Sequence, residues 1–420
     1  MADRKWIGVL KVKNRWYALL IIFVSFLQFT INWFNIVPAF GGLESDLQLR
    51  MPELGLVVGM FIAGYGIAHI PGGMLAEACG MRFAMLFGIA VETFGTVLSA
   101  CAHDYTLLLV GRFVCGVGGS IYIGSAIGLT TAWFRDHEIA LANGLIAGVA
   151  FTIGAALGLF VWADVVKALG WRHALLFGAF IGAATLIALA FLFPEPARSG
   201  QMSAETTGHH LDRASMRRIF GNGKLWVLGL AYLGGYGSYF TAAQLLPSYA
   251  ADHLHLDAQA AGSLGVTLLL SGALGGALGG WVADKWLGHV PTIVGAWVLQ
   301  AVALMLVPHL GYGGLQVAAA AIGGFAVAGG VAWFSLPGLY RSELELSDIP
   351  TAVGLMLTIV ATGGVAIPAA FGKVATDSGY PAAWLMLGIA TAGTTLFCFF
   401  IRKPDAVPAD SFECGRVAEN

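Results

Sequence analysis

Charged residues are scarce in this sequence: Asp, Glu, Lys and Arg make up 11% of its 420 residues, against about 25% in an average soluble domain. Hydrophobic residues make up 58%. This composition excludes a water-soluble globular protein, because apolar runs of such length need a lipid bilayer around them. The formal net charge of −2 also excludes a nucleic-acid-binding protein, which needs a broad basic surface to neutralise phosphates.

Paired cysteines and clusters of metal ligands are missing as well. The five cysteines are scattered and show no spacing typical of a disulfide framework or a metal site: Cys79, Cys101, Cys115, Cys398 and Cys414. We interpret them as packing residues and expect neither a metal nor a cofactor. The apolar runs also lack His, Asp or Ser in catalytic spacing, which argues against an intramembrane enzyme.

What the sequence has instead is a series of apolar runs. Runs broken by Gly, Pro or charged clusters lie at 16–40, 54–76, 82–102, 105–130, 139–162, 172–194, 225–250, 261–283, 290–309, 313–340, 352–374 and 382–402. Each is about twice too long for a barrel strand, and a helix satisfies its own backbone polar groups in lipid. The sequence therefore predicts an all-α membrane protein with about twelve spans.

The distribution of cations predicts the orientation. Seventeen of the 22 Lys and Arg residues lie in the termini or in connections on the same side, whereas Arg50, Lys167, Arg172 and Lys373 lie on the other side. Cytoplasmic connections carry the excess of cations. We therefore expect a multi-pass protein of the cytoplasmic (inner) membrane with both termini in the cytoplasm. The remaining cation, Arg112, lies inside the fourth span.

The chain divides into two halves of six spans each. We expect an N-terminal bundle at 1–194, a polar cytoplasmic linker at 195–224, a C-terminal bundle at 225–402 and a short cytoplasmic tail at 403–420. The second span and the eighth span end in the same pattern of a small residue, apolar residues, Ala and an acid. The acids are Glu77 and Asp284, half a chain apart, which indicates an internal repeat.

Three segments resemble the major facilitator superfamily of secondary transporters, and the resemblance extends from about residue 15 to 402. Residues 73–82 (GMLAEACGMR) are similar to the signature of the loop between spans 2 and 3, with Ala78 in place of a usual base. Residues 108–119 (LLVGRFVCGVGG) are similar to the span 4 signature, with Arg112 before a pair of glycines. The phrases at 133–134, 170–172 and 193–195 also fit.

This resemblance implies two pseudo-symmetric six-helix bundles around a central cavity. It also implies a cytoplasmic gate, in which short acidic and basic segments bind neighbouring helix ends in one conformation and release them in the other. We assign to this gate Gly73, Glu77, Gly80, Arg82, Gly280 and Asp284. The alternative is that both acids are simply solvated helix ends.

Polar residues inside the spans are candidates for solute binding. Arg112 lies about 10 Å inside the outer surface, and Asn32 and Asn35 share its depth. Gln28, Asn32 and Asn35 form one stripe of the first helix. A buried guanidinium is costly and must face protein or water. The alternatives are that Arg112 binds helix-end carbonyls, and that the amides join helices.

The seventh span offers a matching stripe. Tyr232, Tyr236 and Tyr239 have helical spacing, Gln244 lies further out, and Tyr65 on the second span completes the predicted binding set. Hydrogen bonding between helices is again the alternative. Two residues within the spans, His69 and Glu92, are candidates for proton coupling. The resemblance places Glu92 on a scaffold helix, where local pairing is the alternative, so His69 is the better candidate.

Glycines in the fifth and eighth spans indicate close helix packing rather than phosphate binding. They are Gly144, Gly148, Gly154, Gly158, Gly272, Gly275, Gly276, Gly279 and Gly280. Ala155 follows Gly154, so the fifth span lacks the Gly-Pro pair that the resemblance associates with drug and proton antiporters.

The sequence therefore predicts a monomeric secondary transporter that moves a small polar solute by alternating access. A lone arginine in the cavity favours an organic or inorganic anion such as a monocarboxylate, with protons as a candidate coupling ion. The alternatives are a multidrug/proton efflux antiporter and a transporter-like receptor without flux. The expected partners are the solute, protons and the lipid bilayer, without nucleic acid.

Overall fold

The computed structural model describes residues 2–49, 51–136, 138–193 and 213–401, and these are helical apart from short connections. The first half consists of α1 (Ala2–Phe34), α2 (Phe40–Leu47), α3 (Met51–Cys79), α4 (Met81–Ala100), α5 (Tyr105–Phe134), a broken helix at 139–169, and α9 (Trp171–Leu192). The broken helix runs through α6 (Ile139–Asn143), η1 (Gly144–Ala150), α7 (Phe151–Ala156), η2 (Leu157–Val161) and α8 (Trp162–Leu169), of which η1 and η2 are π-helical.

The second half begins with the short helix α11 (Arg213–Phe220). It continues through α12 (Gly223–Leu254), α13 (Ala258–Lys285), α14 (His289–Leu306), η3 (Val307–His309), α15 (Tyr312–Leu339), η4 (Leu346–Asp348), α16 (Ile349–Ser378), α17 (Tyr380–Thr395) and η5 (Leu396–Phe400). Residues 194–212 and 402–420 lie outside the described residues, and they include the first part of the predicted linker (195–224) and all of the predicted tail (403–420).

The predicted spans agree with these helices to within a few residues at most ends. In the described part of the chain, eleven helices are long and apolar enough to cross a membrane. The predicted seventh span, α12, is not among the eleven, because Gly and Tyr replace aliphatic residues through its middle. It is nevertheless a helix of 32 residues that packs within the second half of the chain. The chain is therefore a multi-pass membrane protein, as predicted.

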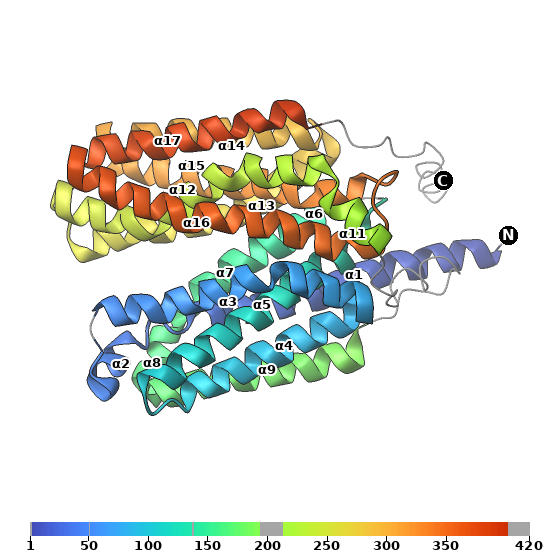
Figure 1. The fold of residues 1–420 in the computed structure, drawn as a ribbon, viewed down its shortest axis with the longest axis horizontal. Helices are drawn as coiled ribbons and strands as arrows, with labels where there is room; N and C mark the ends of the chain where they lie inside the picture. Colours follow the sequence, from blue (N-terminus) through green and yellow to red (C-terminus); the bar gives the residue numbers. More distant parts are fainter. Residues whose placement is uncertain (1, 50, 137, 194–212, 402–420) are drawn as a thin grey trace.

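The helices form two bundles that lie side by side, one from each half of the chain (Figure 1). Helices α4 and α5 pack along each other and on α3 and α9, and α13, α14 and α15 form the corresponding group in the second half. The start of α1 and the end of η5 lie at the same end of both bundles (Figure 1). We call this end the termini side and the other end the opposite side.

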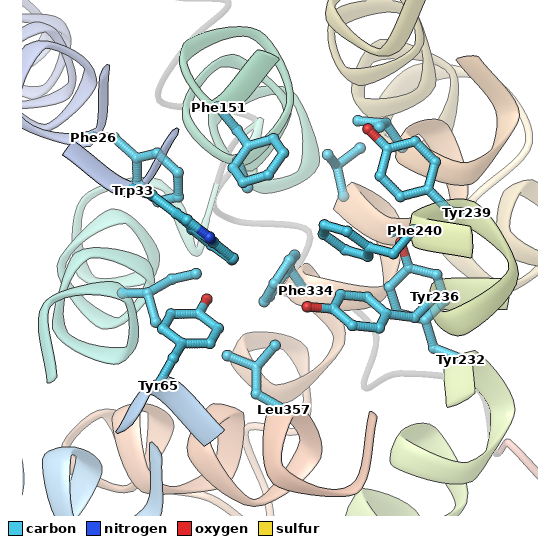
Figure 2. Close-up of a pocket in the computed structure, with 15 residues that line it drawn as sticks. Phe26, Trp33, Tyr65, Phe151, Tyr232, Tyr236, Tyr239, Phe240, Phe334 and Leu357 are labelled. Carbon is cyan, nitrogen blue, oxygen red and sulfur yellow. The ribbon is translucent and has the colours of Figure 1, made fainter. Parts of the chain in front are cut away.

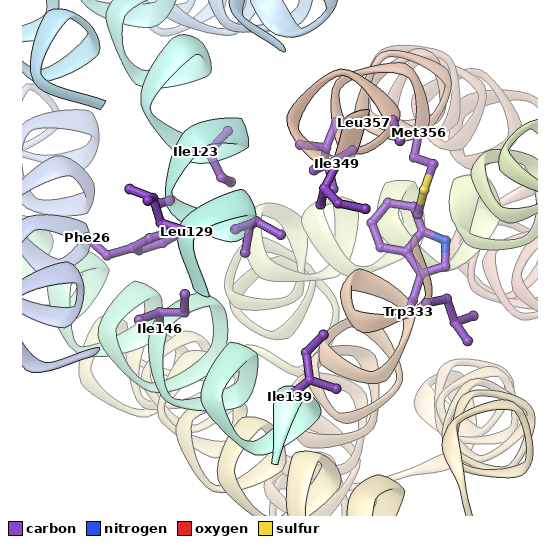
Figure 3. Packing of buried hydrophobic residues seen from close by; sticks show 14 of the residues in the cluster. Phe26, Ile123, Leu129, Ile139, Ile146, Trp333, Ile349, Met356 and Leu357 are labelled. Atoms are coloured by element: carbon purple, nitrogen blue, oxygen red, sulfur yellow. The ribbon is translucent and has the colours of Figure 1, made fainter. Parts of the chain in front are cut away.

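The two bundles meet at the termini side. There α3 packs along α16, and α13 packs along α6 and η1. One hydrophobic core is continuous across the two bundles, and it includes Phe26, Ile146, Trp333 and Met356 (Figure 3). Toward the opposite side the core divides into separate clusters within each bundle. The molecule is thus sealed at one end and divided at the other.

Glycine makes the close approach between bundles possible. A Cβ on Gly148 would lie 2.6 Å from the Cα of Gly276, so the backbones of η1 and α13 touch. Gly154 and Gly158 give α7 and η2 the same close approach to α1. The predicted packing role of these glycines is confirmed.

The short helix α2 is tied to the first bundle on the opposite side. Asp46 accepts a hydrogen bond of 2.9 Å from Trp171 Nε1 and pairs with Arg172. The Trp171 hydrogen bond, followed by that from Arg172, lowers the pKa of Asp46 below its usual value. Helix α2 was not predicted, because a helix of only eight residues has too short an apolar pattern to be recognised.

Candidate functional site

A cavity lies between the two bundles, near the middle of the helices. It encloses about 610 Å³ of space, part of it open to solvent. Its lining comes from both bundles: Phe26, Trp33, Tyr65, Ile123, Ala147, Phe151, Tyr232, Tyr236, Tyr239, Phe240, Val327, Gly330, Val331, Phe334 and Leu357 (Figure 2). The lining is mostly aromatic and carries no charged side chain.

Hydrogen-bond donors are few but face the centre. Figure 2 shows the indole nitrogen of Trp33 and the hydroxyl groups of Tyr65 and Tyr236 on the cavity side of their rings. Tyr232 is held more firmly, because its ring stacks on Trp297 at 4.6 Å and its hydroxyl donates to the Ala326 carbonyl at 3.3 Å. The cavity therefore offers aromatic faces and neutral donors to a solute.

Arg112 does not line this cavity, which corrects its predicted position. Its guanidinium donates to the backbone carbonyls of Asn32 (3.3 Å) and Trp33 (2.9 Å), and it lies 4.8 Å from the Phe61 ring centre. These carbonyls belong to the last turn of α1, which has no helical N–H groups to satisfy them. A cation is also favoured at a helix C-terminus. Arg112 therefore caps α1 in this conformation.

We expect Arg112→Met to destabilise the protein, because it removes the charged donors and leaves two buried carbonyls unsatisfied. The expected loss is about 3 kcal/mol, and Arg112→Lys should lose roughly half of that. Thermal unfolding of the purified protein in detergent measures both variants. A Met variant that melts at the wild-type temperature would contradict the capping role.

The amide stripe of α1 also faces away from the cavity. Gln28 Nε2 donates to Glu92 Oε2 at 3.3 Å, Asn32 Nδ2 donates to the Gly178 carbonyl at 3.4 Å, and Asn35 Nδ2 donates to Asn32 Oδ1 at 3.1 Å. All three side chains therefore lie within the first bundle, against α4 and α9. Gln244, which was also predicted to bind the solute, is exposed and does not line the cavity. Their predicted place at the cavity is corrected.

The two candidates for proton coupling have different surroundings. His69 is buried one helical turn from Tyr65, with ring centres 4.3 Å apart, and its Nδ1 lies 2.7 Å from the Ser120 hydroxyl oxygen. Its own backbone carbonyl lies against Gly354 of α16, in the other bundle. Glu92 is enclosed within the first bundle, beside Gln28. Only His69 adjoins both the cavity and the contact between bundles.

The acid at the end of α13 binds the start of a helix in the other bundle. Asp284 accepts hydrogen bonds from the backbone N–H groups of Ala140 (3.2 Å) and Leu141 (2.7 Å). One turn earlier, a Cβ on Gly280 would lie 2.7 Å from the Cα of Leu141, so only glycine allows α13 to come this close to α6. A carboxylate at a helix N-terminus is favoured by the helix dipole.

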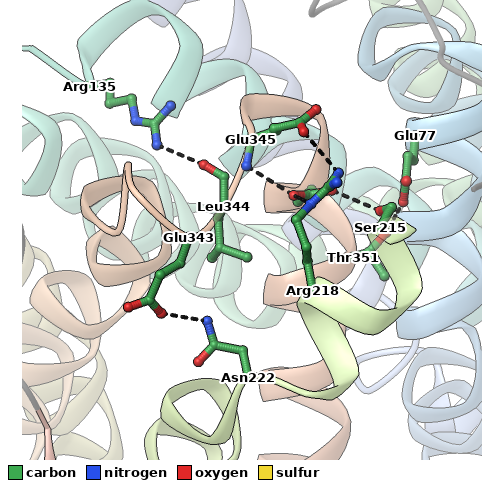
Figure 4. Close-up of polar contacts among 10 residues, drawn as sticks. Glu77, Arg135, Ser215, Arg218, Asn222, Glu343, Leu344, Glu345 and Thr351 are labelled. Carbon is green, nitrogen blue, oxygen red and sulfur yellow. Dashed lines mark hydrogen bonds and ion pairs between the residues drawn. The ribbon is translucent and has the colours of Figure 1, made fainter. Parts of the chain in front are cut away.

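The acid at the end of α3 has a related place but weaker bonds. Glu77 Oε2 accepts from the Thr351 hydroxyl at 3.4 Å (Figure 4). Gly73 lets α3 approach the backbone of α16, since a Cβ there would lie 2.6 Å from Thr351 N. Gly80 has a φ of 91° between α3 and α4, and Arg82 donates to the Ala190 carbonyl at 2.9 Å, within its own bundle.

Arg135 and Arg341 form further contacts between the bundles that were not predicted from the sequence. Arg135 Nε donates to the Gly338 carbonyl at 2.5 Å, and its Nη2 donates to that of Leu344 at 3.2 Å (Figure 4). Arg341 pairs with Asp136 across the same contact. The sequence marks these two arginines only by their position, because each lies in a short connection on the termini side.

Two further ionic contacts support the same region. Burial alone would raise the pKa of Glu138, but Lys285 at 3.1 Å and Arg15 at 3.5 Å outweigh it and hold this pKa below its usual value. The Asp348 carboxylate, 3.0 Å from Arg218 Nε, raises the pKa of Arg218. Both groups are therefore charged at neutral pH.

Two helical bundles around a central cavity, sealed at one end by helix caps and ion pairs, are typical of a membrane transporter. The chain belongs to the Major Facilitator Superfamily, whose sequence model matches residues 19–347. The predicted family and fold are confirmed.

Similar proteins of known description share limited identity with this chain. The chain is 23% identical to the chloroplastic ascorbate transporter of Arabidopsis thaliana, over 86% of this chain and 69% of that protein. It is 24% identical to the probable sulfoacetate transporter SauU of Cupriavidus necator, over 97% of this chain and 98% of that protein. It is 25% identical to the probable L-galactonate transporter of Escherichia coli, over 58% of this chain and 56% of that protein.

Solved structures share the fold. The fucose:proton symporter FucP of E. coli superposes with a TM-score of 0.75 at 18% identity, and the match covers 93% of this chain and all of that one. The human organic anion transporter MFSD10 gives a TM-score of 0.71 at 17% identity, covering 91% and 99%.

Proposed function

We propose that this protein is a secondary active transporter of a small organic anion, such as a monocarboxylate, across the cytoplasmic membrane, with both termini in the cytoplasm. The observation that carries transport of a small solute is the aromatic cavity between two bundles that are sealed at the termini side, and the anionic class of the solute is supported by the similar proteins. With cytoplasmic termini, this conformation faces outward. A likeness to FucP in its outward conformation, with a TM-score of 0.73, supports this assignment.

The cavity favours an organic over an inorganic anion. A small inorganic ion would lose its hydration here without finding a counter-charge or an apolar partner. An organic solute can stack its carbon skeleton on the aromatic rings while its anionic group accepts bonds from Trp33, Tyr65 and Tyr236. The names of the similar proteins, which mention ascorbate, sulfoacetate and L-galactonate as well as nitrate and nitrite, support an anionic solute.

Transport then requires the seal at the termini side to open. We propose that Asp284 releases the start of α6 and that Glu77 releases Thr351, while the ion pairs of Arg341 and Lys285 break. Opening separates α16 from α3, which exposes His69 to cytoplasmic water. His69 is therefore our candidate for proton coupling, and Glu92, which has no contact with the cavity, is assigned a structural role.

A second candidate function is multidrug/proton efflux. The observation in its favour is that aromatic rings without a counter-charge also bind lipophilic cations. Uptake and efflux in sealed proteoliposomes separate the two functions, with a panel of hydroxylated carboxylates, sulfonates, neutral sugars and cationic drugs. We expect flux of a carboxylate or sulfonate. Flux of cationic drugs alone would overturn the anion assignment.

The cavity hydroxyls provide a sharper test. For the solute found in the panel, we expect Tyr65→Phe and Tyr236→Phe each to weaken binding about tenfold, because a hydrogen bond to a charged group contributes about 1.5–3 kcal/mol. Tyr105→Phe is the matched control, because its hydroxyl donates to the Glu53 carbonyl at 3.2 Å, away from the cavity. Equal affinities in all three variants would remove these hydroxyls from the binding site.

A further inference from the structure

A second hollow lies on the termini side of the second bundle, away from the central cavity. It is formed where α11 turns into α12, beside the connection between α15 and α16, and it encloses about 1190 Å³, including open solvent. We call it the basic hollow. Its lining is Arg217, Arg218, Gly221, Asn222, Gly223, Lys224, Val227, Ser342, Glu343 and Phe400.

The basic hollow carries more cations than acids. Arg217, Arg218 and Lys224 line it together with a single acid, Glu343. Arg218 forms ion pairs with Asp348 and Glu345. Lys224 forms an ion pair with Glu343, which also accepts a hydrogen bond from Asn222 Nδ2 at 2.9 Å. Arg217 is exposed and makes no ion pair within the described part of the chain. It offers a free guanidinium to an anion.

The surroundings of the basic hollow are those of a membrane surface. Phe400, which lines it, is 71% exposed, and the neighbouring Phe399 is 78% exposed. Trp226, which lies between the lining residues Lys224 and Val227, is 43% exposed. Exposed aromatic residues at the ends of spans lie at the level of the lipid headgroups. Cations beside them attract anionic lipids.

We infer that the basic hollow binds the phosphate group of an anionic phospholipid, with Arg217 and Lys224 as its main ligands and the acyl chains lying along Phe399 and Phe400. Arginine binds phosphate oxygens in a bidentate manner, and lysine adds a point charge. The phosphate competes with Glu343 for Lys224. This site does not depend on the identity of the transported solute.

The test measures lipid binding to the whole purified protein in a neutral detergent. Phosphatidylglycerol is titrated and bound lipid is counted by native mass spectrometry, with phosphatidylcholine as the uncharged reference. We expect Arg217→Gln to weaken phosphatidylglycerol binding about fivefold, since one cation near an anionic surface contributes about 1 kcal/mol. We expect Glu343→Gln to strengthen it by a similar factor, because the competing carboxylate is gone.

Lys167→Gln is the matched control, since Lys167 is an exposed cation on the opposite side, 79% accessible. It should bind phosphatidylglycerol as the wild type does. Weakening by Lys167→Gln as large as that by Arg217→Gln would mean general charge attraction and overturn the site. Equal occupation of the hollow by inorganic phosphate or glycerol phosphate at the same concentration would overturn the lipid as its ligand. Melting temperatures in phosphatidylcholine alone verify that each variant is folded.

Discussion

Gly280→Leu is expected to abolish transport, with a loss of at least tenfold in the uptake rate. A Cβ at this position already meets the backbone of Ala140 and Leu141, and neither atom group belongs to a flexible side chain. A leucine would hold α13 away from α6. Asp284 would then lose both backbone N–H partners, and the termini side could not seal. Initial uptake rates in proteoliposomes measure the effect.

The same variant should shift the population of conformations. Spin labels on the termini-side ends of α6 and α13 should report a larger distance than in the wild type, because the state sealed at the termini side is destabilised. Gly262→Leu is the matched control: it lies on the same helix, and a Cβ there meets no atom within 4 Å. Wild-type uptake by Gly280→Leu would show that the contact of α13 with α6 does not form the gate.

Much of the fold could be predicted because lipid imposes a simple rule on sequence. A span must be apolar over its length, so its limits can be located from composition. The exceptions have physical reasons. Helix α12 is polar enough to fall below the usual hydropathy of a span, since its tyrosines face the cavity rather than lipid. Helix α11 is short and basic, so its sequence resembles that of a loop.

The candidate site was harder to predict than the spans, and Arg112 shows why. Its depth could be counted along the helix, and the structure does bring it to Asn32. The direction of its side chain could not be predicted, because the carbonyls that it binds lie 79 and 80 residues away in the sequence, at the end of another helix. A polar stripe can likewise face either the interior of its own bundle or the cavity, and helical spacing does not distinguish these two environments.

The repeat predicted equivalent acids at the two gate positions, and the structure makes them unequal. Asp284 binds two backbone N–H groups at the start of α6, whereas Glu77 meets the first turn of α16, where Pro350 has no N–H to donate and Glu77 accepts from the Thr351 hydroxyl. An acid gains most where backbone donors are unsatisfied. The local sequence around Glu77 carries no trace of a partner that lies 274 residues away.

His69→Gln is expected to abolish proton-driven accumulation of the solute and to leave exchange of solute across the membrane intact. Glutamine keeps a polar side chain near the Ser120 hydroxyl but cannot take up a proton in this pH range. In the described conformation His69 is buried, and its backbone carbonyl contacts Gly354 of α16. We expect opening of the termini side, which separates α16 from α3, to expose the His69 side chain to water, so that protonation and conformation are coupled. Accumulation under an imposed pH gradient and counterflow without a gradient measure the two activities.

Glu92→Gln is the matched control, because it also removes a buried group that can take up a proton, but one without contact with the cavity. We expect it to retain accumulation driven by the pH gradient. If Glu92→Gln loses accumulation while His69→Gln keeps it, the roles of the two residues are reversed. If both variants accumulate solute as the wild type does under the gradient, neither residue carries the coupled proton. Loss of counterflow in His69→Gln would instead indicate that His69 supports the cavity itself, through its contact with Tyr65.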